Sequence, residues 1–387
     1  MTTIRSFIPI TWFLTSSAFA AWALNSPQRQ RFILSPLVII SAVLSFCTLQ
    51  HLTWPLGLNS IWGLGVSVWT LHITALLYTK DSLSQSLGHI QPRADINWRR
   101  TYKLWTNTRL LTVPIPQIAP IKRIHQQSRL RFAAFMVLRI AMSVAVDQLV
   151  VTRALQAMHL HLLDFAAVRE TYIRRVLQGY TIASHDTQVR AFFSVHWIWS
   201  AYFLINTAHH ILAFFFVVVL RLDQPDEWPP LFGSPLEAYT VQRFWGKFWH
   251  RLAYRPYLAC AGICSHHILK TPRGSRSEKL VETFFIFLLS GVTHSLVAWQ
   301  LSDRCGKTRD IFFFMANFLA GALEMVLSKT TQSFAARYRL TKYLNHSITI
   351  LLKRMFGYLW VWLFFAWIIP KWHYPKVYCA LQDFYQT

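Results

Sequence analysis

Apolar residues in this chain gather into long runs that are separated by shorter polar segments. The longest run lies between Arg190 and Arg221, where thirty consecutive positions carry no Asp, Glu, Lys or Arg. About 20 apolar residues suffice for a helix to cross the roughly 30 Å hydrocarbon core of a bilayer. The pattern therefore predicts an all-α integral membrane protein, with residues 1–387 forming a single multi-span membrane domain. We expect about eight transmembrane helices, near 6–24, 33–53, 55–78, 133–158, 195–219, 282–301, 311–328 and 348–370.

The first predicted span has a second interpretation. Arg5 precedes an apolar stretch that contains Ala18-Phe19-Ala20, and this pattern also suits a cleaved secretory signal peptide. Cleavage would leave an odd number of spans and would disturb the distribution of charge between the loops. We therefore expect the first span to be retained.

Composition and charge agree with a membrane protein. Hydrophobic residues make up 53% of the chain and charged residues only 14%, whereas a soluble domain is about a quarter charged. Lys and Arg outnumber Asp and Glu by 39 to 16. Such an excess suggests nucleic acid in a soluble protein, but here the basic residues lie between the spans, so we expect membrane lipid and no nucleic acid. Because positive loops face the cytoplasm, we expect lumenal termini and cytoplasmic loops at 25–32, 79–131, 221–280 and 329–347.

Metal-dependent classes of membrane enzyme find little support in the sequence. A di-iron oxygenase needs repeated His clusters, which this sequence lacks, and a prenyltransferase needs two acidic clusters to hold a diphosphate through Mg²⁺. One weak acidic candidate exists, at 223–227, and such a cluster in a charged loop is most often simply solvated. The grouping of Cys260, Cys264, His266 and His267 matches no common zinc spacing. We expect no metal and no bound cofactor.

A Pro- and Gly-rich loop at 228–235 leads into a segment with helical periodicity. On a helix over 240–252, at 100° per residue, basic and aromatic side chains separate onto two faces. The basic face has Arg243, Lys247, His250 and Arg251, and the aromatic face has Phe244, Trp245, Phe248, Trp249 and Leu252. The pattern predicts an amphipathic helix that lies at the cytoplasmic membrane interface. Periodicity alone favours a helix that only anchors the loop to lipid.

A histidine stands inside the sixth predicted span. His294 follows Ser290 by four positions and Gly291 by three, so the two small residues share its helix face. A polar ring inside the hydrocarbon region is costly and marks a functional candidate, and small residues beside it let another helix or a ligand approach. The structural alternative is a histidine that hydrogen-bonds a neighbouring helix.

Together these segments resemble the membrane-bound O-acyltransferases, and in particular their wax-synthase-like branch in fungi. The resemblance covers about 228–300 and is carried by Pro-Leu-Phe-Gly-Ser-Pro, then Arg-Phe-Trp-Gly-x-Phe-Trp-His, then Ser-Gly-x-x-His in a span. It implies transfer of an acyl group, most simply acetyl, from acyl-CoA to the hydroxyl of an apolar metabolite such as a terpenoid or meroterpenoid. It also implies that His294 is the family's invariant histidine. His250 stands at a second polar position, where many relatives have Asn and the fungal-type members have His.

The residue types suit that reaction. His294 is expected to accept the proton of the substrate hydroxyl, which attacks the thioester directly. His250 or the Trp249 indole would stabilise the developing oxyanion, and Arg243, Lys247, Arg251 and Trp249 would bind acyl-CoA at the cytoplasmic face. The resemblance implies the endoplasmic reticulum membrane. A polytopic transporter, with histidines along a transport path, is the alternative function, and a membrane prenyltransferase is a weaker one.

Overall fold

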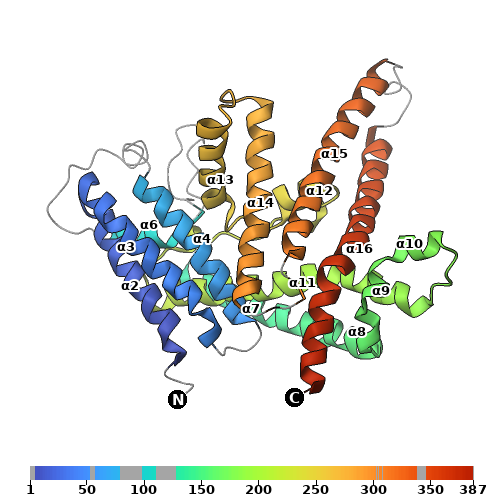
Figure 1. Ribbon diagram of the computed structural model, residues 1–387, viewed down its shortest axis with the longest axis horizontal. Helices are drawn as coiled ribbons and strands as arrows, with labels where there is room; N and C mark the ends of the chain where they lie inside the picture. The colour runs from blue at the N-terminus through green and yellow to red at the C-terminus, as the bar shows by residue number, and fades with distance from the viewer. Residues whose placement is uncertain are drawn as a thin grey trace. The chain divides into compact units, whose positions relative to one another are not determined.

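The computed structural model describes residues 5–52, 57–78, 98–109, 128–301, 303, 305–306, 308–337 and 346–386. In these ranges the regular structure is helical and no strand occurs (Figure 1). The α-helices are α2 Phe7–Leu24, α3 Gln28–Cys47, α4 Leu58–Tyr78, α6 Trp98–Thr106, α7 Arg129–Val146, α8 Thr152–Ala157, α9 Ala167–Glu170, α10 Tyr172–Leu177, α11 Ser184–Phe214, α12 Val241–Arg243, α13 Tyr254–Ile263, α14 Arg276–Gln300, α15 Arg309–Arg337 and α16 His346–Gln386. Single π-helical turns extend α7, α11, α12 and α13 at Asp147–Val151, Phe215–Val219, Phe244–Phe248 and Cys264–Ile268.

Eight of the described helical segments are long and apolar enough to cross a membrane, and they correspond to the eight predicted spans. The predicted fold class, an all-α multi-pass membrane protein, is confirmed. The predicted cytoplasmic loops fall partly on 79–97, 110–127 and 338–345, which lie outside the described residues.

Two span boundaries differ from the prediction for identifiable reasons. α11 begins at Ser184 rather than near 195, because the buried polar residues Asp186 and Arg190 in its first turns are paired and need no water. α16 passes through Pro370 and Pro375, where the sequence suggests an end. A proline removes one backbone hydrogen bond and bends a helix, and a long apolar helix that packs on its neighbours can absorb this cost.

The chain divides into two compact units, each built from two chain segments. The first unit comprises 1–124 and 251–314, and the second comprises 125–250 and 315–387. The expectation of a single membrane domain stays a prediction.

In the first unit, α2, α3 and α4 pack side by side (Figure 1). Small residues at the α2–α3 contact bring the two backbones close. The hydroxyl of Ser16 donates to the carbonyl of Val38 at 2.7 Å, which satisfies a buried polar group across the helices. The short basic helix α6 docks against this core, with the Trp105 ring 5.9 Å from that of Trp69 and the Leu104 carbonyl 2.8 Å from the His72 ring. Part of a predicted loop is therefore ordered against the spans.

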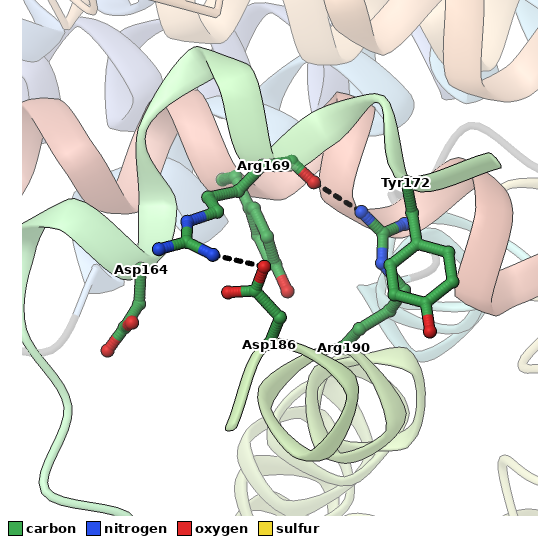
Figure 2. A pocket seen from close by; sticks show the side chains of 6 residues that line it. Asp164, Arg169, Tyr172, Asp186 and Arg190 are labelled. Carbon is green, nitrogen blue, oxygen red and sulfur yellow. Dashed lines mark hydrogen bonds and ion pairs between the residues drawn. The ribbon is translucent and has the colours of Figure 1, made fainter. Parts of the chain in front are cut away.

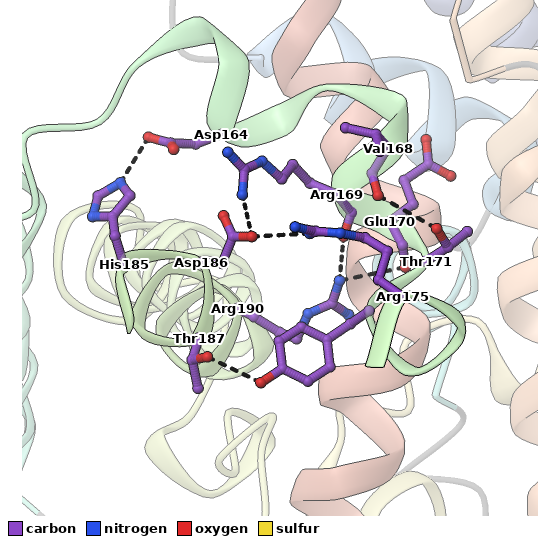
Figure 3. A network of polar contacts seen from close by, with 11 residues as sticks. Asp164, Val168, Arg169, Glu170, Thr171, Arg175, His185, Asp186, Thr187 and Arg190 are labelled. Atoms are coloured by element: carbon purple, nitrogen blue, oxygen red, sulfur yellow. Dashed lines mark hydrogen bonds and ion pairs between the residues drawn. The ribbon is translucent and has the colours of Figure 1, made fainter. Parts of the chain in front are cut away.

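In the second unit, a cluster of buried charges connects α9, α10, α11 and α16 (Figures 2 and 3). The Asp186 carboxylate pairs with both Arg169 and Arg175. Arg190, 7% exposed, donates to the backbone carbonyls of Arg169 and Glu170, and it donates to the carbonyl of Ala366 on α16 at 2.8 Å. These contacts link segments that are far apart in the sequence.

The same cluster contains no space that a water molecule could fill. Burial alone would raise the pKa of the Asp164 carboxyl. The hydrogen bond with the His185 ring at 3.0 Å, and another from the His161 backbone N–H, instead bring that pKa below its usual value. We interpret the cluster as a structural clamp.

The predicted amphipathic helix over 240–252 is shorter than expected. Helical structure covers α12 and the π-helical turn Phe244–Phe248, and the chain is extended at Trp249. The Phe248 carbonyl accepts a hydrogen bond from the Gly233 N–H at 2.8 Å, which removes it from the helical hydrogen-bond pattern. His250 consequently lies outside the helix. The separation of faces was nevertheless predicted correctly, since Phe244, Phe248 and Trp249 are buried and Lys247 and Arg251 are exposed.

Candidate functional site

The motif segment of the second unit begins with a tight loop that depends on Gly233. A Cβ atom at this position would lie 2.0 Å from the Lys247 carbonyl oxygen, so a side chain cannot be accommodated without moving the backbone. The next residues form the 3-10 turn Pro235–Glu237, with Pro235 in its first position and the Ser234 hydroxyl accepting from the Leu236 N–H. The loop therefore lies directly against the turn that precedes His250.

Glu324 of α15 holds the beginning of α12 in place. Its carboxylate accepts the backbone N–H groups of Val241 at 2.6 Å and Gln242 at 3.0 Å, and the Trp360 indole N–H at 2.7 Å. An anion at a helix N-terminus is favoured by the unpaired N–H groups and the helix dipole. Glu324 is absent from the residues that the sequence singled out. The sequence signal that could have identified Glu324 is that an acidic residue stands within an apolar span, where charged residues usually have a function.

Two further contacts fix the motif segment to α15. The Trp245 indole donates to the side-chain oxygen of Asn317, which is buried, at 2.8 Å. The Gln242 amide donates to the Gly321 carbonyl at 2.8 Å. Asn317, Gly321 and Glu324 follow one another at helical spacing, so one face of α15 contacts both α12 and the π-helical turn that follows it.

His250 lies at the end of an aromatic cluster. The ring of Phe232 meets the His250 ring edge-on, with centroids 5.5 Å apart, and the Trp249 ring lies 5.4 Å away. Phe244 and Phe248 pack behind Trp249. The His250 side chain is half-buried. A rigid apolar wall of this kind fixes the direction of the imidazole and limits access of water to it.

The predicted acyl-CoA ligands differ in their surroundings. The Arg243 guanidinium is already engaged, because it pairs with the Glu237 carboxylate, donates to the Glu237 carbonyl and lies over the Tyr239 ring. Lys247 and Arg251 are exposed. In the first unit, burial lowers the pKa of the Arg109 guanidinium, and repulsion from Arg251 lowers it further. Arg109 and Arg251 thus repel each other electrostatically, and Arg109 is a residue that the sequence did not indicate as part of a site.

His294 belongs to the first unit, within α14. Its half-buried ring lies 5.1 Å from the ring of Phe314. One turn earlier, a Cβ atom at Gly291 would lie 2.8 Å from the Ile311 Cα atom. The prediction that a small residue here allows close approach of another helix is confirmed, and the helix is α15.

The neighbouring face of α14 is packed against α13. The Tyr257 hydroxyl hydrogen-bonds the side chain of Thr293, the residue before His294. Burial raises the pKa of Tyr257 to about 12, and the hydrogen bond offsets only part of this rise. The phenol is therefore neutral at physiological pH, and it serves as a fixed polar contact beside the histidine rather than as a titrating group.

The two units divide the predicted site residues between them. Arg243, Lys247, Trp249 and His250 belong to the second unit, and Arg251 and His294 belong to the first. The joint action of His250 and His294 stays a prediction.

Comparison with known proteins confirms the family resemblance. Residues 228–316, which contain both histidines, match the membrane bound O-acyl transferase family. Acetyltransferase atnC of Arthrinium sp is 29% identical over 196 residues, which are 50% of this chain and 43% of that protein. Acetyltransferase ataH of Aspergillus terreus is 30% identical over 165 residues, covering 41% of this chain and 49% of that protein. Acetyltransferase TRI7 of Fusarium sporotrichioides is 27% identical over 182 residues, covering 46% and 40%.

This chain thus spans less than half the length of each of these relatives. No solved structure matches it. The motif region 228–316 matches the membrane bound O-acyl transferase family, and the matched relatives are named acetyltransferases.

Proposed function

We propose that this protein is an acyl-CoA-dependent O-acyltransferase that transfers an acetyl group to a hydroxyl of an apolar metabolite. The observation that carries the proposal is the family match over 228–316, because that stretch holds both motif histidines. The choice of acetyl is supported by the relatives, each of which is named an acetyltransferase. A terpenoid or meroterpenoid acceptor follows from the resemblance to the fungal branch.

His294 is the general base of the proposed reaction. A neutral imidazole takes the proton from the acceptor hydroxyl as the oxygen attacks the thioester carbonyl, the carbon–sulfur bond breaks, and CoA leaves as its thiolate. The proton then passes to the thiolate, so that the products are the ester and free CoA. General-base catalysis typically contributes about 10² to 10⁴ in rate. Direct transfer needs no covalent acyl-enzyme.

His250 and Trp249 stabilise the negative charge that develops on the thioester carbonyl oxygen. Both lie at the end of the aromatic cluster of the second unit, where water is limited and a hydrogen bond to an oxyanion is strengthened. The rigid packing of Phe232 and Phe244 against Trp249 supports preorganisation of this pair.

Acyl-CoA would arrive from the cytoplasm, and its phosphates would bind the exposed cations. Lys247 and Arg251 carry this role in the proposal, together with Arg109, since repulsion between two neighbouring guanidiniums is relieved by a phosphate between them. Arg243 contributes mainly to structure, because Glu237 and Tyr239 already occupy its guanidinium. The apolar alcohol would enter from the bilayer. A multi-pass location in the endoplasmic reticulum membrane belongs to the same proposal.

The test of function uses microsomes that express wild type or His294→Ala at matched protein levels. Radiolabelled acetyl-CoA is supplied with an extract of candidate apolar alcohols, and label in apolar esters is counted. We expect label with wild type and at least a hundredfold less with the variant. Equal transfer by both proteins would eliminate His294 as the base. Failure of acetyl-CoA and longer acyl-CoAs with every alcohol would favour a transporter instead.

The donor site has its own test. Replacing Lys247 and Arg251 by Gln should raise the KM for acetyl-CoA more than tenfold while changing the KM for the alcohol little. Arg243→Gln is the control, because it removes one positive charge from the same segment but is expected to act through stability. Equal changes of both KM values in the double variant would indicate membrane anchoring rather than donor binding.

A further inference from the structure

Three metal-ligating side chains come together at the end of the α13–α14 hairpin, away from both motif histidines. His266 lies on the π-helical turn that follows α13, and Glu278 and Glu282 lie one turn apart near the beginning of α14. One ring nitrogen of His266 and one oxygen of each carboxylate all lie within 4.8 Å of one another. The Glu278 side chain is almost fully buried, and those of His266 and Glu282 are partly buried. Two elements, rather than one run of acidic residues, therefore supply the cluster.

The geometry of the cluster is close to that of a bound metal ion. Ligand atoms around tetrahedral zinc lie at about 2.0–2.2 Å from the ion. The His266 Nε2 atom and the Glu278 Oε1 atom are 3.0 Å apart, a separation that places both within reach of one such ion. A small movement of the Glu282 side chain would bring its oxygen to the same ion.

The Glu278 carboxylate is oriented before any ion binds. Its second oxygen accepts the backbone N–H of Gly274, and its own backbone N–H donates to the Ser275 hydroxyl at 3.0 Å. The first oxygen is thereby directed to His266. Such outer contacts fix a ligand's position and are typical of carboxylates that bind metals.

Glu282 distinguishes this cluster from a simple ion pair. His266 and Glu278 alone account for one pair, yet Glu282 adds a second negative charge on the same side of α14. Within the described part of the chain, its carboxylate makes no hydrogen bond and no ion pair. Lys279 is the nearby competing cation, and it influences Glu282 electrostatically. Two carboxylates this close repel each other, and a divalent cation between them converts the repulsion into attraction.

The chemistry of the donor set selects the kind of ion. One imidazole and two carboxylates suit Zn²⁺ better than Mg²⁺ or Ca²⁺, which prefer oxygen ligands only. Thiolate ligands do not take part. Cys260 and Cys264 are free, and burial raises the pKa of the Cys260 thiol, which keeps it protonated. The partners of His266 in the cluster are therefore glutamates from the next helix and not the neighbouring cysteines.

We infer that His266, Glu278 and Glu282 form a binding site for a divalent transition-metal ion, most suitably Zn²⁺, that fastens the end of α13 to the beginning of α14. A water molecule would complete the coordination. The site is structural rather than catalytic, because His294 lies about 18 Å beyond Glu282 along α14, at a rise of 1.5 Å per residue. The inference is independent of the proposed acyl transfer.

The test measures zinc on the purified full-length protein in detergent after removal of metals with a chelator and desalting. Wild type is expected to retain about one zinc per chain after incubation with ZnCl₂, measured by mass spectrometry of the metal. His266→Gln and Glu282→Gln should each weaken binding at least tenfold. His267→Gln and Cys264→Ser are matched controls, since both change a neighbouring possible ligand outside the cluster, and they should bind zinc as wild type does.

A second measurement uses wild type alone and does not depend on the folding of any variant. Cobalt substituted for zinc should show visible absorption bands of a nitrogen and oxygen environment, without the strong near-ultraviolet band that thiolate ligands produce. Absence of zinc binding by wild type, equal binding by Glu282→Gln, loss of binding in either control, or a thiolate band would each overturn the inference.

Discussion

The two motif histidines are held in place by different means. His250 ends a short segment whose position depends on residues far away in the sequence, above all Glu324 and Asn317 of α15. His294 stands in the middle of the long helix α14, where its own backbone hydrogen bonds fix it and Gly291 brings α15 close. One histidine is thus positioned by tertiary hydrogen bonds and the other by secondary structure and close packing.

This difference predicts which changes will affect each region. A long membrane helix forms from its own sequence, since every backbone group is satisfied within it. A three-residue helix followed by one π-helical turn is too short to be stable alone. The environment of His250 should therefore be lost through remote substitutions, and that of His294 through substitutions where α14 contacts α13 and α15.

The largest expected effect is that of Glu324→Gln. The change removes the negative charge that accepts two backbone N–H groups at the beginning of α12, and one amide oxygen cannot replace both carboxylate contacts. Charged hydrogen bonds of this kind contribute about 1.5–3 kcal/mol each. We expect at least a tenfold loss of acetyl transfer and a lower melting temperature in detergent. Glu227→Gln is the control, because it removes the same charge from a partly buried carboxylate that accepts the Gln224 N–H in a short 3-10 turn outside the motif segment. Full activity of Glu324→Gln would show that His250 does not depend on this anchor.

The next effect concerns the loop that packs against the π-helical turn. Gly233→Ala places a Cβ atom 2.0 Å from the Lys247 carbonyl oxygen and should destabilise the segment by about 3 kcal/mol. Gly246→Ala adds the same methyl group where no atom lies within 4 Å. Melting temperatures of both variants in one detergent provide the measurement. Similar melting temperatures would contradict the tight contact.

A smaller effect is expected at the contact beside His294. Gly291→Ala brings a Cβ atom to 2.8 Å from the Ile311 Cα atom, so α14 and α15 must separate slightly, at a cost of about 1–3 kcal/mol. Gly262→Ala, in α13 with open space around it, should instead stabilise by up to about 1 kcal/mol through helix propensity. Thermal unfolding distinguishes the two, and a stabilised Gly291→Ala would contradict the close packing.

The smallest expected effect is a pH dependence of the stability that the cluster of buried charges in the second unit contributes. The folded state lowers the pKa of Asp164, so the stabilisation is present above the unfolded value of about 4 and is lost as the pH falls through the folded value. Asp164→Asn should cost about 1 kcal/mol at pH 7 and should flatten the decrease in melting temperature below about pH 4. Parallel curves for wild type and variant would assign the acid sensitivity to other groups.

The sequence by itself determined the eight spans, the fold class and the family resemblance. A span can be recognised from the sequence alone, because crossing a bilayer requires a run of apolar residues of a certain length. Each membrane helix also makes its backbone hydrogen bonds within itself, without help from other segments. The motif residues around His250 and His294 could likewise be read in order along the chain, which is why the family match falls where the resemblance did.

Only the tertiary structure decided how those residues are held. A regular period of 3.6 residues predicted a helix over 240–252, but the hydrogen bond from Gly233 to Phe248 and the π-helical turn ended it before His250. The contacts of Glu324 with α12, and the grouping of His266 with Glu278 and Glu282, join segments that are separate in sequence. Periodicity describes neighbours along one element, whereas hydrogen bonds and charge pairs depend on which elements fold against each other.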